Sequence, residues 1–184
     1  MKPVYMINGF LESGKTQFIS YTLGQPYFQS RETTLLVLCE EGVEEYDEKL
    51  LKKSHTVMEV IENEEDFTPE YLTELEKKHK PGRIIIEYNG MGNIRSMKLP
   101  RSWRIEQQIT TIDGSTFPMY YTNMRSQLAE MVKNSEMIIM NRCDGVQDLN
   151  TYKRNIKAVN PRADVIFEDA NGEITDILED DLPY

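Results

Sequence analysis

The sequence has few cysteines, no long apolar run and no leader-like start. Its two cysteines, Cys39 and Cys143, lie far apart and form no C-x-x-C pair, which favours reduced thiols over a disulfide framework. No apolar run approaches the roughly 20 residues that a membrane-spanning helix requires. The chain begins directly in an expected strand, without the charged region and cleavage site of a secretory leader. We therefore expect a cytoplasmic protein that does not associate with membranes.

Basic residues are also in short supply. The 21 lysines and arginines are outnumbered by 31 acidic residues, which gives a formal net charge of −10. A nucleic-acid partner is therefore not expected, because a polyphosphate requires a basic surface. Nucleotide binding is not excluded, since one lysine, backbone amides and a metal ion can neutralise phosphates locally. The length of 184 residues and an apolar content of 39% fit a single domain over residues 1–184.

Residues 9–16 form a complete phosphate-binding loop (P-loop). They read Gly-Phe-Leu-Glu-Ser-Gly-Lys-Thr, which matches G-x-x-x-x-G-K-[ST]. An apolar run over 4–7 predicts a strand before the loop, and the following helix is expected to close at Gly24. The loop amides and the helix dipole would hold the phosphates, Lys15 would reach the β- and γ-phosphates, and Thr16 would bind Mg²⁺. The nucleotide-binding residues predicted from this loop are Glu12, Ser13, Gly14, Lys15, Thr16 and Gln17.

Strand-like and helix-like segments alternate along the chain. The expected strands cover 3–8, 34–39, 56–61, 83–87, 105–112, 136–140 and 164–167, and the expected helices cover 15–23, 45–53, 69–79, 123–133 and 149–158. Continuously apolar strands such as 35–38 are typical of a parallel sheet that is covered on both faces. The pattern predicts a three-layer α/β fold of the P-loop NTPase type, with a mostly parallel sheet and helices on both faces. Residues 88–104 are expected to form a long functional or mobile loop, and an acidic tail from about 176 is expected to be loosely held.

Acidic side chains follow two of the expected strands. Ligands of an open α/β sheet bind at the carboxyl ends of its strands, so these side chains should converge with the P-loop. Glu87 follows the apolar run 84–86, and Glu40 follows the second strand. We expect both to organise Mg²⁺ directly or through water, and we assign catalytic roles to Lys15, Thr16 and Glu87. The alternative is that these glutamates are ordinary surface residues of an acidic protein.

A third strand end carries Asn141-Arg142-Cys143-Asp144. Guanine offers two neighbouring N–H donors that one carboxylate can accept together, and adenine has no such pair. In many GTPases the pattern N-K-x-D at a strand end reads guanine in this way. Here Arg142 replaces the lysine, and its guanidinium plane can stack on a purine. We expect Asn141 and Asp144 to bind the nucleotide and Asp144 to select guanine.

Together these motifs resemble the CobW-type branch of P-loop GTPases, which includes HypB- and UreG-like metal-insertion GTPases and zinc chaperones. The resemblance spans nearly the whole chain. The segments that carry it are Pro3–Thr16, Leu38–Gly42, Glu87–Gly90, Ile109–Asp113, Asn141–Asp144 and Val159–Ala163. It implies slow Mg²⁺-dependent GTP hydrolysis in the service of metal handling or metalloprotein maturation. It also implies a client metalloprotein or a homodimer partner beside the guanine nucleotide.

The sequence departs from that family at three points. Glu12 stands where the family often has glycine, and the C-x-C-C metal-transfer motif is missing, since Glu62–Phe67 at that place has no cysteine. The family also often has a second, smaller domain that is not seen here. Because a soft-metal relay needs thiolates, we expect zinc to bind weakly. Two rival hypotheses stay open: an ATP-using P-loop enzyme of the kinase or synthetase type, and a nucleotide-binding regulatory module without significant turnover.

Overall fold

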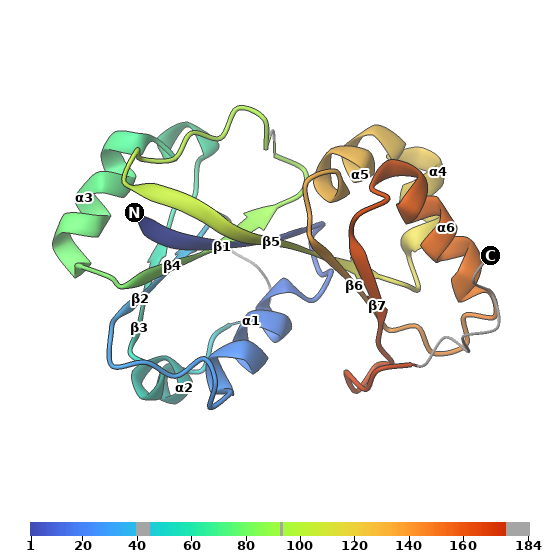
Figure 1. The fold of residues 1–184 in the computed structure, drawn as a ribbon, viewed down its shortest axis with the longest axis horizontal. Helices are drawn as coiled ribbons and strands as arrows, with labels where there is room; N and C mark the ends of the chain where they lie inside the picture. Colours follow the sequence, from blue (N-terminus) through green and yellow to red (C-terminus); the bar gives the residue numbers. More distant parts are fainter. Residues whose placement is uncertain (40–44, 93, 176–184) are drawn as a thin grey trace.

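A single parallel sheet organises the protein. The computed structural model describes residues 1–39, 45–92 and 94–175, and within these residues seven strands pair side by side, all in parallel (Figure 1). The strands are β1 (Lys2–Gly9), β2 (Thr34–Leu38), β3 (Thr56–Val60), β4 (Arg83–Asn89), β5 (Trp103–Asp113), β6 (Met137–Asn141) and β7 (Asp164–Phe167). Their order across the sheet is β3-β2-β4-β1-β5-β6-β7, so β1 and the P-loop that follows it lie in the middle.

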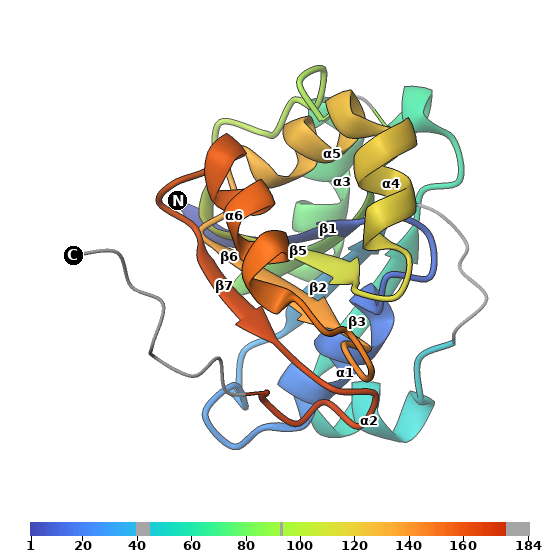
Figure 2. The same cartoon turned by 90° about the vertical axis from the view of Figure 1, so that its right-hand side faces the viewer.

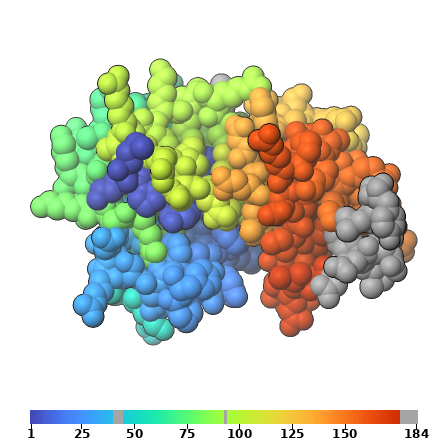
Figure 3. Space-filling model, viewed as in Figure 1, coloured from blue at the N-terminus to red at the C-terminus, as the bar shows by residue number. Residues whose placement is uncertain are grey.

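Helices cover both faces of this sheet. They are α1 (Lys15–Gly24), α2 (Glu48–Lys53), α3 (Pro69–His79), α4 (Phe117–Asn123), α5 (Arg125–Val132) and α6 (Leu149–Val159), with a 3-10 turn η1 (Glu64–Asp66). In two perpendicular views, α1 and α2 lie below the sheet, and α3, α4, α5 and α6 lie on the other side (Figures 1 and 2). The space-filling view shows α6 and β7, in orange and red, at the opposite end of the molecule from α3, in green (Figure 3).

The two-sided cover explains why the strands are continuously apolar. Leu35 and Val37 of β2 pack with Leu72 of α3, whereas Leu36 between them packs with Ile19 of α1 on the other face. All of these side chains are at most 1% exposed. Alternate residues of a strand point to opposite faces, so both sets must be apolar when both faces are buried. The predicted three-layer α/β fold of the P-loop NTPase type is confirmed.

Two expected helices begin later in the structure than predicted. The helix expected over 45–53 begins at Glu48, because Asp47 is its N-cap and accepts a hydrogen bond of 2.8 Å from the Lys49 amide. The helix expected over 123–133 is α5, and it is preceded by α4, which the sequence did not predict. Pro118 is tolerated in the first turn of α4, and the buried Phe117 anchors this helix on the core. Tertiary packing therefore stabilises a helix in a segment whose local helix propensity is low.

A buried polar network fixes the end of β1. The Asn8 side chain donates to the Met131 carbonyl of α5 over 3.1 Å and accepts from the Thr110 hydroxyl of β5 over 2.6 Å. Asn8 and Thr110 are fully buried, and Ser135 hydrogen-bonds to Thr110 from the chain after α5. Satisfied buried networks of this kind define one arrangement of the elements that they join. The network therefore sets the point from which the P-loop starts.

Some expectations fall on parts of the chain for which less can be said. The acidic tail from about 176 lies outside the described residues, and a single domain over 1–184 stays a prediction. The long loop expected over 88–104 is shorter than predicted, because β4 extends to Asn89 and β5 begins at Trp103. Among the described helices, none combines the length and apolar character that would let it cross a membrane.

Candidate nucleotide-binding site

The P-loop turns tightly between β1 and α1, and two of its glycines have no room for a side chain. Gly14 has a φ of 95°, and a Cβ there would lie 2.4 Å from the Asn141 side-chain nitrogen. A Cβ on Gly9 would lie 2.6 Å from the Thr111 carbonyl oxygen of β5. The Ser13 hydroxyl is hydrogen-bonded to the Thr111 hydroxyl at 2.8 Å. The loop is therefore packed directly against the carboxyl ends of β5 and β6.

Lys15 lies at the centre of this loop. Its side chain is 4% exposed, and its Nζ donates to the carbonyl oxygens of Gly9 and Phe10, both at 2.9 Å. These two carbonyl groups stabilise the buried ammonium group and hold it within the turn of the P-loop. This is the position from which a lysine can offset the charge of phosphates bound by the loop amides.

Thr16 and Glu87, predicted as magnesium ligands, are brought together at one side of the loop. The Thr16 hydroxyl donates to Glu87 Oε1 over 3.1 Å, and the Tyr46 hydroxyl donates to Glu87 Oε2. Glu87 is 6% exposed at the end of β4. A hydroxyl and a carboxylate form the oxygen donor set that a hard cation such as Mg²⁺ prefers. Glu40, the third predicted ligand, lies outside the described residues.

The turn after β6 adjoins the P-loop. The Asn141 side chain donates to the Ser13 carbonyl over 2.7 Å, and its buried Oδ1 has no hydrogen-bond partner among the described residues. Asp144 is exposed, and its Oδ2 accepts from the Ala170 amide over 2.6 Å, in the loop after β7. Gln17 and Glu12 are exposed at the rim of the loop. The predicted phosphate and base residues therefore surround one edge of the sheet.

Comparison with known families identifies this arrangement. The sequence model of the CobW/HypB/UreG nucleotide-binding domain matches residues 3–167, which include the P-loop, Glu87 and the turn after β6. The chain belongs to this family. A comparison with curated protein sequences gives no match.

Solved structures of the CobW/HypB/UreG type have the same fold. The hydrogenase maturation factor HypB from Archaeoglobus fulgidus superposes with a TM-score of 0.68 at 17% identity, over 92% of this chain and 82% of that one. The Zn(II)-bound YjiA GTPase from E. coli gives 0.63 at 20% identity, over 89% of this chain and 56% of that one. HypB from Helicobacter pylori in complex with nickel gives 0.55 at 17% identity, over 91% and 80%. This chain therefore spans little more than half of the YjiA chain.

Arg142, which replaces the lysine of the N-K-x-D pattern, ties the P-loop to β5. Its Nη1 donates to the Glu12 carbonyl over 2.8 Å and to Asp113 Oδ2 over 2.7 Å. Burial alone would raise the pKa of the Asp113 carboxyl, but hydrogen bonds from Ser115 and Arg142 outweigh it and lower that pKa. Glu12 has a φ of 58°, a conformation that suits glycine, at the position where family members often have that residue. Arg142 thus holds a loop residue in an unfavourable backbone conformation.

The segment that carries C-x-C-C in other family members has no metal-binding cluster in this chain. Residues 62–67 contain η1 and an Asn63–Asp66 hydrogen bond, and a cavity of about 390 Å³ is lined by Cys39, Glu62 and Glu64 among others. In the described part of the chain, no group of three or more His, Cys, Asp or Glu side chains is arranged to hold a metal ion. Burial raises the pKa of the Cys143 thiol to about 11, so this thiol is protonated at neutral pH.

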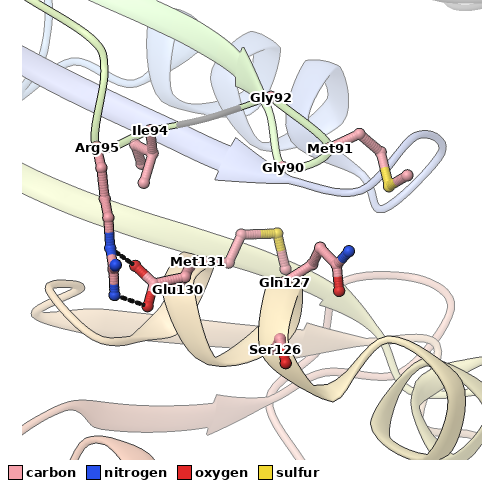
Figure 4. Close-up of a pocket in the computed structure, with 9 residues that line it drawn as sticks. All are labelled: Gly90, Met91, Gly92, Ile94, Arg95, Ser126, Gln127, Glu130 and Met131. Carbon is pink, nitrogen blue, oxygen red and sulfur yellow. Dashed lines mark hydrogen bonds and ion pairs between the residues drawn. The ribbon is translucent and has the colours of Figure 1, made fainter.

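A further cavity of about 310 Å³ lies beside the P-loop. It separates the chain after β4 from α5, and Arg95 reaches across it to form an ion pair with Glu130 (Figure 4). Gly90 at its edge donates its amide to the Gly9 carbonyl over 2.9 Å. Arg95 is thus paired with Glu130 across this cavity.

Two side chains at the site were not predicted from the sequence. Tyr46 donates to Glu87, and Thr111 contacts Ser13 of the P-loop. Both are separated from their partners by about 40 residues or more. Tyr46 belongs to no motif, and Thr111 lies in the segment Ile109–Asp113, in which only the strand and its final aspartate carried the resemblance. The strand order that brings β5 next to β1 would have to be known before Thr111 could be identified.

Proposed function

We propose that this protein binds GTP and Mg²⁺ and hydrolyses GTP slowly, in the service of metal handling or metalloprotein maturation. The observation that carries the proposal is the 2.7 Å hydrogen bond from the Asn141 side chain to the Ser13 carbonyl. It joins the phosphate-binding loop to the turn that would read the base, so one nucleotide can contact both. Membership of the CobW/HypB/UreG family supports the same function.

Each site residue has a role in this proposal. Lys15 and the amides of 12–16 offset the charge of the phosphates, and Asp144 accepts the two N–H donors of guanine. Thr16 and Glu87, together with Glu40, hold Mg²⁺. Held by these residues, Mg²⁺ would offset the negative charge of the phosphates during hydrolysis. The hydroxyl and carboxylate oxygens at Thr16 and Glu87 fit such an ion.

The partners follow from the related proteins. One similar structure is a hydrogenase maturation factor, and others contain zinc or nickel, so we propose a client metalloprotein or a second copy of this chain as partner. Such a partner would also complete hydrolysis, because Arg95 is engaged with Glu130 and no arginine of this chain is assigned to the phosphates. Both cysteines are reduced, which suits the reducing cytoplasm.

Nucleotide binding and turnover test the proposal and separate it from its rivals. We expect Mg²⁺-dependent binding of GTP and GDP by calorimetry, and single-turnover hydrolysis of GTP on the order of 10⁻⁴ to 10⁻² s⁻¹, as in GTPases without an activator. Tighter binding of ATP than of GTP would favour an ATP-using kinase or synthetase. Tight GTP binding without hydrolysis, even when a partner is added, would favour a regulatory module.

Zinc is expected to bind weakly. The described residues hold no cluster of three metal-ligating side chains. The pKa of the Cys143 thiol is raised to about 11, so this residue does not offer the thiolate that zinc prefers. Zinc titration against a chromophoric chelator should therefore give only weak binding that depends on the nucleotide. A stoichiometric, high-affinity zinc site that survives removal of nucleotide would contradict this prediction, and substitution of Cys39 would then be the first test of its ligands.

A further inference from the structure

The carboxylate of Glu87 is held from two sides. One oxygen accepts from Thr16, at the start of α1, and the other accepts from Tyr46, which lies on a different segment before α2. Tyr46 was not part of any motif. The proposed function assigns roles to Thr16 and Glu87 but leaves the tyrosine without one.

Tyr46 is built into the structure as a rigid donor. Its side chain is 9% exposed and belongs to the buried cluster between α1 and the sheet that also contains Ile7, Ile19 and Leu36. The next residue, Asp47, caps α2 by accepting from the Lys49 amide, which fixes the backbone beside the tyrosine. A ring fixed by packing and a backbone fixed by a helix cap leave the hydroxyl little freedom to move away from Glu87.

We infer that Tyr46 is a positioning residue that makes the site selective for Mg²⁺ over larger divalent cations. The inference rests on the proposed function, because it concerns the same metal. Ca²⁺ takes six to eight oxygen ligands and commonly binds a carboxylate through both oxygens, whereas Mg²⁺ requires strict octahedral geometry and retains several waters. With Oε2 held by the tyrosine hydroxyl, Glu87 offers one oriented oxygen next to Thr16. That arrangement suits Mg²⁺ and disfavours a cation that needs both oxygens.

The test is Tyr46→Phe in the full chain, which removes one hydroxyl and keeps the ring in the core. Binding of a fluorescent GDP analogue is measured in EDTA and in titrations with Mg²⁺ and with Ca²⁺. We expect the Mg²⁺ concentration for half-maximal effect to rise about tenfold, as for loss of a hydrogen bond to a charged group. The Ca²⁺ concentration for half-maximal effect should stay the same or fall. Nucleotide affinity in EDTA should stay within about twofold, since the hydroxyl acts through the carboxylate of Glu87, which is proposed to bind the metal.

Two controls make the result specific. Tyr5→Phe removes a hydroxyl from the same core cluster at a residue whose ring contacts Phe28, and it should leave both metal titrations unchanged. In a Glu87→Gln background, Tyr46→Phe should have little further effect on the ratio of the Mg²⁺ and Ca²⁺ concentrations for half-maximal effect. The reason is that the two side chains act through one hydrogen bond.

The outcomes separate this inference from the proposed function. If the unsubstituted protein binds GDP with no response to Mg²⁺, both the metal site and the role of Tyr46 are wrong. If it responds to Mg²⁺ and Tyr46→Phe responds identically, only the inference about Tyr46 is overturned. Tyr46→Phe could also lower both the thermal stability and the nucleotide affinity in EDTA, while the ratio of the half-maximal Mg²⁺ and Ca²⁺ concentrations stays unchanged. That result would show that the tyrosine is purely structural and would overturn the inference as well.

Discussion

Lys15→Ala should reduce GTP and GDP affinity by at least about 100-fold, measured by calorimetry or by a fluorescent nucleotide. A charge-assisted hydrogen bond contributes about 1.5–3 kcal/mol, so the two or more that Lys15 would donate to phosphate oxygens sum to at least about 3 kcal/mol, and each 1.4 kcal/mol changes an affinity about tenfold. Lys15 is the cation at the centre of the loop, held by the carbonyls of Gly9 and Phe10. The rest of this chain has a net negative charge that repels polyphosphate, which makes the loss of this cation more costly.

The matched control is Lys53→Ala, which removes the same charge from the exposed end of α2. It should bind nucleotide as the unsubstituted protein does, and far-UV circular dichroism should show the same fold for both variants. If Lys15→Ala keeps its affinity for GTP, the loop does not bind phosphate and the proposed function is wrong.

Asp144→Ala should remove the preference for guanine and leave much of the affinity for the triphosphate. We expect the unsubstituted protein to bind GTP at least about tenfold more tightly than ATP, because a paired hydrogen-bond readout of a base gives roughly 1–3 kcal/mol of discrimination. The carboxylate is exposed at the turn after β6, on the same edge as the P-loop. Competition of GTP, ATP and XTP against a fluorescent nucleotide measures the change.

Two further variants test whether the effect belongs to the base. Asp144→Asn keeps the size of the side chain but presents one donor and one acceptor, which complement xanthine, so XTP should gain relative to GTP. Asp148→Ala removes a nearby carboxylate that caps α6 by accepting from the Thr151 amide over 2.9 Å. It should cost about 1 kcal/mol of stability and leave the base preference unchanged. Equal GTP and ATP affinities in the unsubstituted protein would instead favour the ATP-using rival.

Local patterns were sufficient where one segment contains both the signal and the structure. Residues 9–16 predicted the P-loop because glycines, lysine and threonine lie at fixed spacing within a single strand–loop–helix unit. The apolar strands predicted a parallel sheet covered on both sides, and Leu35, Leu36 and Val37 pack to opposite faces as expected. The convergence of Thr16 and Glu87 also followed from the rule that strand ends share one edge.

Local patterns failed where packing outweighs propensity. The segment 117–123 contains a proline, two tyrosines and an asparagine, and it forms α4 because Phe117 and its neighbours pack on the core. The ring of Phe10 from the P-loop stacks on Tyr120 of this helix with centroids 4.3 Å apart. A contact between residues more than 100 positions apart produces no hydrophobic periodicity in either segment from which it could be predicted.

The sequence by itself determined the class of fold, the phosphate-binding loop and the set of strand-end side chains around it, because each of these depends on the order and spacing of nearby residues. Only the tertiary structure decided which distant side chains support that site. Three hydrogen bonds join different elements in this way: Tyr46 donates to Glu87, Arg142 donates to the Glu12 carbonyl, and the Thr111 hydroxyl is bonded to that of Ser13. Such contacts depend on the order of strands across the sheet and on the packing of helices over it, which are set by the free energy of the whole chain.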